Sequence, residues 1–370
     1  MKYISCFSGI GGFEGSQPPV MFCELDPECR EVLQTLHPGV ESWDNVETLV
    51  PPQADLVVGG WPCQDISVAG RQAGLSGLKS RLLLDMLRVA TEAGASTVAA
   101  ENVANLLKMR NGYEFRASLD AFHEAGFTYV AWRLLNARSF GLPQHRQRLI
   151  IVASKMREVA VSLFRGLPKF EPASELDITA AGFYWTAGTH SINYSRGYLP
   201  TIKIGSTLGI ASPPAVHYAD VVRQVTAKEA LKLQGFDIPE GLFQSQAAAF
   251  RAAGNAVARP IGRWVIDGLF SNEQQPFELE PPHPTLFDID SMPEQFPESG
   301  LSEAGVWGGI NLPSADLASN LADFLDLETE SRLSKRAASG LLRRVEQSGQ
   351  KIPSSLQYSL EQIIAGGRND

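Results

Sequence analysis

Short apolar runs alternate with helix-like patterns over the first 154 residues of this 370-residue chain. The runs end at glycine, acidic or polar residues, which is typical of buried strands. Strands are predicted at Tyr3–Cys6, Val20–Glu24, Asp55–Gly59, Thr97–Glu101, Thr128–Leu134 and Leu149–Ala153. Because strands that alternate with helices usually pair in parallel, the pattern predicts an α/β fold with an open, doubly wound, mostly parallel sheet.

Helix start signals lie between the predicted strands. Asp26 directly precedes Pro27, so Asp26 is predicted to cap a helix that begins with proline. Asn111 and Glu114 have the spacing of a capping box, in which two side chains satisfy backbone N–H groups at a helix start. Farther along the chain, a single helix is predicted over Ala247–Leu269.

The alternation breaks after residue 154, where Gly, Ser, Thr and aromatic residues dominate and predict a small, irregular domain. Near the end, Gly349 and Pro353 separate two predicted helices. The predicted segments are a first domain at 1–154, a small β-rich domain at 155–244, a helix returning to the first domain at 245–270, an acidic Pro-rich linker at 271–330 and a basic helical tail at 331–370.

Charged residues are distributed unevenly, so the net charge of −9 does not exclude a nucleic-acid partner. Residues 1–270 contain 25 basic and 25 acidic residues, whereas residues 271–330 contain 13 acidic and no basic residues. Residues 331–370 contain 7 basic and 3 acidic residues. Residues 125–157 contain no acid. Their basic residues are Arg133, Arg138, Arg146, Arg148, Lys155 and Arg157. Phosphate contact depends on such local clustering rather than on the overall charge.

The cysteines and histidines exclude several classes of protein. The 4 cysteines form no CxxC pair, which argues against a disulfide scaffold or a zinc site. The 6 histidines form no metal-ligand cluster, so no metal is expected. No apolar run is long enough to span a bilayer, and the first residues lack the pattern of a secretion signal. We therefore expect a protein of the reducing cytoplasm without a membrane partner.

A glycine turn follows the first predicted strand, with Gly9, Gly11 and Gly12 in the sequence Phe-Ser-Gly-Ile-Gly-Gly. Such a turn is more often only a turn, but Glu24 stands 15 residues after Gly9 at the end of the next strand. A carboxylate there is suited to hold the hydroxyl pair of a ribose. Nicotinamide cofactors place this acid about 20 residues on, so the spacing slightly favours S-adenosylmethionine.

Cys63 differs from the other cysteines because Gly59, Gly60 and Pro62 place it in a loop after a strand. Nucleophilic thiolates need such partly exposed positions, whereas a lone cysteine such as Cys29 is usually a small buried apolar residue. The sequence therefore predicts that Cys63 is a nucleophile.

Glu101 ends a neighbouring predicted strand, so it is expected at the same edge of the sheet as Cys63. A carboxylate in this place is also often a helix cap or one half of an ion pair. Gln144, Arg146 and Arg148 alternate, which predicts one face of a strand. A solvated basic strand would have the same pattern, but the apolar run after Arg148 favours a side chain in a cleft.

Eight motifs in this order resemble the cytosine-5 DNA methyltransferases of bacteria and phages. They are CFSGIGGFEGS, FCELDPEC, WDNV, GGWPCQDISVAG, AENVANLL, FGLPQHRQRLIIVAS, RQVTAKEALKLQGFDIP and AAGNAVARPIG, and they cover roughly residues 1–270. The resemblance implies a Rossmann-like class I methyltransferase sheet, S-adenosylmethionine as cofactor, and the small domain as the target-recognition domain.

The resemblance also implies roles for single residues. Cys63 would attack C6 of a cytosine flipped out of the duplex, and Glu101, as a protonated acid, would donate to N3. Arg148 would contact the cytosine and Arg146 would help to hold the site. The implied cofactor-binding residues are Phe7, Gly9, Gly11, Gly12, Glu24, Leu25, Asp44, Asn45, Pro62, Asn255 and Val257, and the implied substrate-binding residues are Gln64, Ser67, Arg71 and Gln144. Ser5 stands where the family often has Asp, which weakens one contact to the methionine end of the cofactor.

Two other functions stay open at this point, namely methylation of RNA and non-catalytic binding of DNA. The expected partner is double-stranded DNA, with a cognate restriction endonuclease as a second possible partner, and the expected state is a monomer. The tail is expected either to contact DNA phosphates through Lys335, Arg336, Arg343 and Arg344 or only to cap the chain. On the first interpretation, truncation after Ser271 leaves the chemistry intact.

Overall fold

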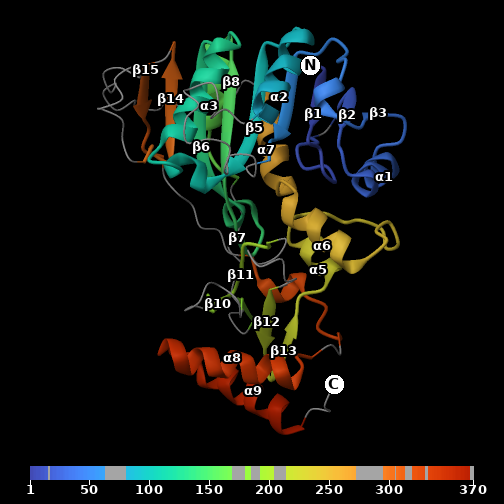
Figure 1. The fold of residues 1–370 in the computed structure, drawn as a ribbon, viewed down its shortest axis with the longest axis vertical. Coiled ribbons are helices and arrows are strands. Elements are labelled where there is room, and N and C mark those ends of the chain that lie inside the picture. The colour runs from blue at the N-terminus through green and yellow to red at the C-terminus, as the bar shows by residue number, and fades with distance from the viewer. Residues whose placement is uncertain are drawn as a thin grey trace. The chain divides into compact units, whose positions relative to one another are not determined.

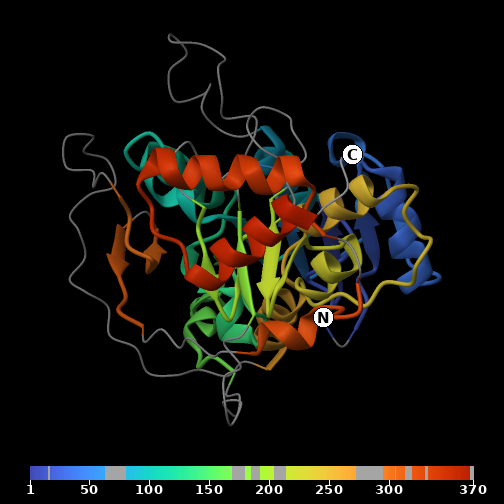
Figure 2. The same ribbon diagram turned by 90° about the horizontal axis from the view of Figure 1, so that it is seen from below.

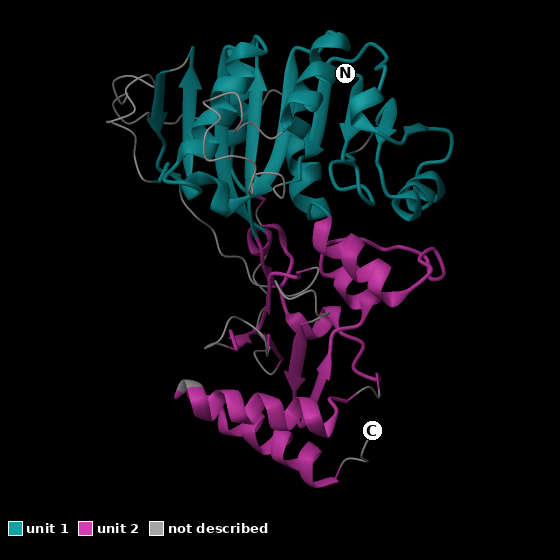
Figure 3. Ribbon diagram, in the orientation of Figure 1, with its two compact units in different colours: residues 1–136, 147–167, 256–315 teal, residues 137–146, 168–255, 316–370 magenta. Residues whose placement is uncertain are grey.

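The computed structural model describes residues 1–15, 17–62, 81–168, 180–184, 192–203, 214–271, 295–304, 306–312, 319–329 and 332–366. The chain divides into two compact units, each built from three separate stretches (Figure 3). Unit 1 comprises Met1–Asn136, Gln147–Leu167 and Ala256–Ala315, and unit 2 comprises Ala137–Arg146, Pro168–Asn255 and Asp316–Asp370. These units differ from the continuous domains predicted from the sequence, because later parts of the chain return to the first sheet.

The described residues of unit 1 form a nine-stranded sheet in the order β15-β14-β6-β8-β5-β4-β1-β2-β3 (Figure 1). The pairings give every strand one direction except β8 and β14, which run antiparallel to their neighbours. The strands are β1 Tyr3–Cys6, β2 Met21–Cys23, β3 Glu41–Trp43, β4 Leu56–Gly60, β5 Thr97–Val103, β6 Tyr129–Asn136, β8 Gln147–Ser154, β14 Ser299–Glu303 and β15 Val306–Gly309. The predicted α/β class with a mostly parallel sheet is confirmed.

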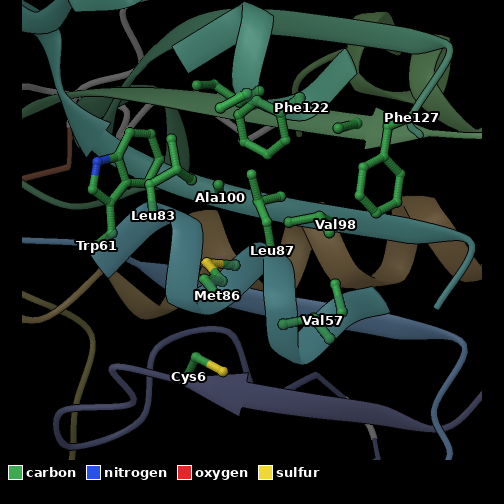
Figure 4. Close-up of a cluster of buried hydrophobic side chains, with 14 of the residues drawn as sticks. Cys6, Val57, Trp61, Leu83, Met86, Leu87, Val98, Ala100, Phe122 and Phe127 are labelled. Atoms are coloured by element: carbon green, nitrogen blue, oxygen red, sulfur yellow. The ribbon is translucent and has the colours of Figure 1, made fainter. Parts of the chain in front are cut away.

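Helices cover this sheet and bury its faces. Those of unit 1 are α1 Pro27–Leu36, η1 Val46–Thr48, α2 Arg81–Glu92, η4 Ala104–Lys108, α3 Tyr113–Glu124, α4 Arg157–Val161, η6 Ser162–Phe164 and α7 Arg259–Ser271. Leu83, Met86 and Leu87 of α2 pack on Val57 of β4 and Val98 of β5 in the main core (Figure 4). All four residues of β1 are buried, as expected for a strand with a layer on each face.

Two predicted helix starts have different outcomes. The Asp26 side chain accepts from the N–H groups of Glu28 and Cys29 at the start of α1, so that prediction is confirmed. The prediction of a capping box at Asn111 is wrong, because Asn111 has φ 54° and α3 begins without a side-chain cap. Glu114 instead pairs with Arg110 at 3.2 Å.

The helix predicted over Ala247–Leu269 consists of α6 Gln246–Asn255 and α7. The break falls just before Pro260, the second residue of α7, because proline lacks the N–H group that a continuous helix would need there.

The hairpin of β14 and β15 lies within the predicted linker 271–330 and is part of the sheet. Its Trp307 and the preceding Phe296 are buried against Phe115 and Trp132, with ring centroids of 4.8 to 6.4 Å. The indole of Trp132 also donates to the Pro297 carbonyl at 3.0 Å. The expectation that truncation after Ser271 leaves the chemistry intact does not fit this packing, since it would remove two strands and two buried aromatic rings.

Unit 2 contains a four-stranded sheet in the order β10-β9-β12-β13 and a two-stranded pair of β11 and β7. Its described elements are η5 Ala137–Phe140, β7 Gln144–His145, β9 Ala181–Phe183, β10 Ser195–Arg196, β11 Leu199–Pro200, β12 Ala215–Tyr218, β13 Val221–Gln224, α5 Ala227–Lys232, α6, η8 Leu321–Phe324, α8 Lys335–Ser348 and α9 Ser354–Gly366. Gly349, with φ 64°, ends α8 as the sequence predicts.

The two C-terminal helices pack on the small sheet of unit 2 (Figure 2). Leu341 of α8 and Leu356 and Leu360 of α9 share a buried cluster with Phe183 and Val222 of the strands. The two helices of the tail, α8 and α9, are therefore part of unit 2. Arg336 and Arg343 remain exposed on α8.

Replacing Trp307 with Ala is expected to lower the free energy of unfolding by about 3–5 kcal/mol, the usual cost of emptying a buried aromatic site. Denaturant unfolding measures this change. Val306→Ala is the matched control, because Val306 is 48% exposed on the same strand. Equal stability of the two variants would contradict a structural role for the hairpin.

Candidate active site

The glycine turn after β1 brings Glu24 to the place predicted for it. Gly9 and Gly11 have φ values of +56° and +83°, which favour glycine. The Gly9 N–H donates to Oε2 of Glu24 at 2.7 Å, and the Asp26 N–H donates to Oε1 at 2.8 Å. Burial raises the pKa of Glu24, so the two N–H groups offset part of the cost of its charge. A carboxylate is thus fixed at the carboxyl ends of β1 and β2.

The start of α7 lies directly against this turn. A Cβ atom added to Gly12 would lie 2.7 Å from the carbonyl oxygen of Val257, and one added to Gly262 would overlap the Gly12 backbone. Val257 is therefore placed beside the predicted cofactor turn, as the sequence analysis expects. Asn255 is exposed at the end of α6 and belongs to unit 2.

The other predicted cofactor residues follow β1, β2 and β3. Phe7 comes directly after β1 with φ 51°. Leu25, which follows Glu24, is 74% exposed, and Asp44 is exposed directly after β3. The Asn45 side chain accepts from the Glu47 N–H at 3.0 Å and so caps η1. The carboxyl ends of parallel strands are where ligands bind in such sheets.

An adenosyl cofactor fits these residues. A Cβ atom on Gly9 would meet open space, while the Glu24 carboxylate lies within hydrogen-bond distance of the Gly9 amide. Exposed Leu25 and Asp44 stand at the neighbouring strand ends, where an adenine ring would lie. Small residues, one buried carboxylate and an apolar contact are the chemistry that a ribose and a purine require.

Cys63, Gln64, Ser67 and Arg71 lie outside the described residues, so their predicted roles stay predictions. The chain that leads to Cys63 is described as far as Pro62, which is exposed.

Trp61, just before Pro62, is buried, and its carbonyl accepts from Nδ2 of Asn102 at 3.2 Å. Asn102 therefore anchors Trp61, two residues before the predicted nucleophile. No sequence pattern singles out Asn102, although it directly follows Glu101.

Glu101 and Arg148 meet in an ion pair at the same edge of the sheet. Nε of Arg148 lies 2.8 Å from Oε1 of Glu101, and both side chains are largely buried. Oε2 of Glu101 faces Gly60, where an added Cβ atom would lie 2.8 Å away. One carboxylate oxygen is thus held by the arginine, while the other points at the strand that leads to Cys63.

Gln144 and Arg146 belong to unit 2 and are fully buried. Nε2 of Gln144 donates to the Leu233 carbonyl at 3.0 Å, and its Oε1 accepts from the Ile202 N–H at 3.1 Å. Arg146 donates to the carbonyls of Ile202 at 3.3 Å and Gly254 at 3.0 Å. These two side chains tie the stretch 137–146 of unit 2 to three positions in its stretch 168–255.

The predicted alternation of Gln144, Arg146 and Arg148 on one strand is not observed. Gln144 lies in β7 and Arg148 in β8, and the boundary between the two units falls after Arg146. Arg148 is the one of these three that reaches Glu101.

Within the described part of the chain, no group of three or more His, Cys, Asp or Glu residues has the geometry to hold a metal ion. None of the described helices is long and apolar enough to cross a membrane.

The family model described as C-5 cytosine-specific DNA methylase matches residues 1–182. The type II methyltransferase M2.BsuMI of Bacillus subtilis (strain 168) is 35% identical over 299 residues, which cover 73% of this chain and 75% of that protein. The type II methyltransferase M.HaeII of Haemophilus aegyptius is 23% identical over 298 residues, which cover 73% of this chain and 93% of that protein.

Among solved structures, the S. pombe Dnmt2 methyltransferase superposes with a TM-score of 0.51 and 15% identity, covering 73% of this chain and 98% of its own. This likeness shows that the fold is shared.

The close approach of Gly60 to Glu101 predicts a selective effect of Gly60→Ala. The new methyl group would displace Oε2 of Glu101 and is expected to lower the rate of methyl transfer by roughly 100-fold, the lower range for loss of a general acid. S-adenosylmethionine affinity, measured by calorimetry, is expected to stay within about threefold. Gly340→Ala is the control, because a Cβ atom there meets open space. If the Gly60→Ala variant transferred methyl groups at the wild-type rate, Oε2 of Glu101 would have no role in the reaction.

Proposed function

The chain belongs to the C-5 cytosine-specific DNA methylases, which methylate C5 of cytosine in DNA with S-adenosylmethionine, and we propose that Cys63 and Glu101 carry out this reaction on a base in duplex DNA. The observation that carries the proposal is the packing of Oε2 of Glu101 against Gly60, three residues before Cys63. That oxygen faces the strand that leads to Cys63, which supports a shared site for the acid and the predicted nucleophile.

The Cys63 thiolate forms a bond to C6 of the cytosine, and N3 takes a proton from Glu101. C6 is stacked inside the duplex, so the base must first be flipped out. S-adenosylmethionine supplies the methyl group, which C5 takes up. Water then takes the proton from C5, the C5=C6 double bond forms as the C6–S bond breaks, and the sulfur leaves as the thiolate. N3 returns its proton to Glu101.

Arg148 positions the acid and contacts the base. Its Nε atom holds Oε1 of Glu101, so the carboxyl group is oriented before the cytosine arrives. The remaining guanidinium donors are suited to an acceptor oxygen on the ring, such as O2 of cytosine. Arg148→Lys keeps the charge but loses this planar geometry.

Gln144 and Arg146 act on the architecture of unit 2 rather than on the substrate. Both are buried and donate to main-chain carbonyls from other segments. Gly254, which Arg146 holds, directly precedes the predicted cofactor residue Asn255. Gln64, Ser67 and Arg71 keep their predicted roles at the flipped base and its phosphates.

Unit 2 offers a basic and aromatic surface for the DNA backbone. The guanidinium of Arg138 lies 4.3 Å from the centre of the Tyr198 ring, and the His145 ring is 6.3 Å from the same ring. His145 and Arg196 are exposed. Basic side chains beside aromatic rings are typical of nucleic-acid contacts. We assign this surface to phosphate contact and residues 155–244 to reading the base sequence.

We propose three further properties of the protein. The protein acts as a monomer in the cytoplasm, where its DNA is, and a cognate restriction endonuclease cuts the same sequence when that sequence is unmethylated. Bisulfite sequencing of DNA from expressing cells identifies the methylated sequence. Gel filtration with light scattering tests the oligomeric state.

A covalent adduct through Cys63 is expected with duplex DNA that contains 5-fluorocytosine at the target. Fluorine cannot leave as a proton does, so the enzyme stays bound when S-adenosylmethionine is present. Cys63→Ala should form no adduct on a denaturing gel, while Cys29→Ala, which alters a buried cysteine, should form it. A tRNA with the same modified base is the control for substrate class. An adduct with Cys63→Ala would refute the assignment.

Arg138→Ala is expected to flatten the salt dependence of DNA binding by roughly 0.9 log units per log unit of salt, the value for one lost phosphate contact. Fluorescence anisotropy over a salt series measures the slope. Lys228→Ala is the matched control in unit 2, because Lys228 is exposed and pairs with Glu240 at 2.8 Å. The double variant Arg336→Ala, Arg343→Ala tests the tail in the same assay. An unchanged slope would show that the substituted residues do not contact DNA phosphates.

A further inference from the structure

Glu14 is a buried carboxyl group beside the glycine turn to which the mechanism above gives no role. It is 2% exposed, and its Oε1 accepts from the Ser5 hydroxyl at 3.3 Å. A Cβ atom on Gly11 would lie 2.8 Å from its Oε2. None of the ion pairs among the described residues includes Glu14. Burying a carboxyl group without a cation is costly, so its retention beside the turn needs a reason.

The position of Glu14 separates it from the adenosine side of the pocket. Glu24, which is assigned to the ribose, follows β2, and Asp44 follows β3. Glu14 instead contacts Ser5 in β1, the strand between β2 and β4. Since β4 leads to Cys63, the methionine part of the cofactor must extend from the ribose towards β1 and β4 to bring its methyl group to the base.

Resting on the function proposed above, the geometry points to Glu14 as the group that binds the methionine ammonium of S-adenosylmethionine. The cofactor would then supply a cation in direct contact with the carboxylate, which none of the ion pairs among the described residues provides. Ser5, whose short side chain leaves room for Glu14, orients the carboxylate by its hydroxyl donor. Glu14 is thus a cofactor-binding residue contributed by the turn itself.

The groups that face Glu14 affect its charge in a definite way. Burial raises the pKa of Glu14 to about 7. Hydrogen bonds from the backbone of Glu14, from Ser5 and from the backbone of Gly12 oppose this shift, as does, more weakly, the charge of Arg259 at the start of α7. On β1, the pKa of Tyr3 is raised far above neutral by burial, so its phenol stays protonated. Asp267 of α7 lies near Gly15, beside the same turn, and is exposed. In the free protein near pH 7, Glu14 is therefore partly protonated.

Cofactor binding should release a proton from Glu14, because a nearby cation favours the ionised carboxylate. Calorimetry in buffers of different ionisation enthalpy measures this release. At pH 7, wild-type protein is expected to release up to about half a proton more than Glu14→Gln per bound S-adenosylmethionine, and the difference should vanish at pH 8.5. Any protons that the amine of the cofactor itself gains or loses contribute equally to both proteins, so they do not affect the difference. Asp267→Asn, an exposed carboxylate near the same turn, should behave as wild type.

Three ligands distinguish the ammonium of S-adenosylmethionine from its sulfonium as the partner of Glu14. S-adenosylhomocysteine keeps the ammonium but lacks the sulfonium charge, and it should release the same extra proton. Adenosine lacks both and should release none. Glu14→Gln should weaken S-adenosylmethionine about tenfold at pH 8 and leave adenosine unchanged, as for the loss of one charged hydrogen bond.

Other outcomes would overturn the proposal without touching the proposed function. Release of the extra proton with S-adenosylmethionine but not with S-adenosylhomocysteine would show that Glu14 interacts with the sulfonium instead. Equal weakening of adenosine and S-adenosylmethionine would make Glu14 a structural support of the turn. If Glu14→Gln does not fold, the wild-type comparison of S-adenosylhomocysteine with adenosine decides, since equal proton release by both ligands refutes the ammonium contact.

Discussion

The pairing of β5 with β4 on one side and β8 on the other determines where this protein can do its chemistry. Gly60 pairs with Glu101 in the parallel ladder, and Val103 pairs with Arg148 in the antiparallel ladder. Residues two apart on a strand share a face, so Arg148 reaches diagonally across to Glu101. A register slip of one residue would turn the carboxylate to the opposite face of the sheet. The apolar packing of this sheet is therefore what keeps acid, arginine and nucleophile strand together.

Arg146 and Arg148 are two residues apart and have different partners. Arg146 is held by main-chain carbonyls in unit 2, whereas Arg148 holds a carboxylate in unit 1. Both are charged groups with little solvent, and each is satisfied by a different kind of acceptor. A motif that looks uniform in the sequence therefore has different kinds of partner in the two units. Neither arginine is replaceable by lysine on simple charge grounds, because both use planar nitrogen donors.

Much of the fold follows from local pattern, and the remainder depends on distant partners. The strand predicted at Tyr3–Cys6 is observed with the same bounds, because four apolar or small residues lie between Lys2 and the glycine turn that follows Phe7. The strand Ser299–Glu303 has no apolar run, and only its pairing with β6 and its position beside Trp132 make it a strand.

The site shows the same division. The proximity of Glu24 to the glycine turn follows from spacing, but the pairing of Glu101 with Arg148 depends on an antiparallel register that no local signal encodes. Glu14 was missed because a single acid in a loop carries no pattern; only its burial against Ser5 distinguishes it.

The hairpin of β14 and β15 also imposes an order on synthesis. The Trp132 indole and the Pro297 carbonyl that it contacts are 165 residues apart. A ribosome that adds about 5–20 residues per second completes that distance only after roughly ten seconds or more. During this interval, β6 would be the edge of a growing sheet, with an open row of backbone donors and acceptors and an uncovered indole. Nascent chains of this protein therefore expose an unpaired strand edge to one another and to chaperones until β14 and β15 have emerged.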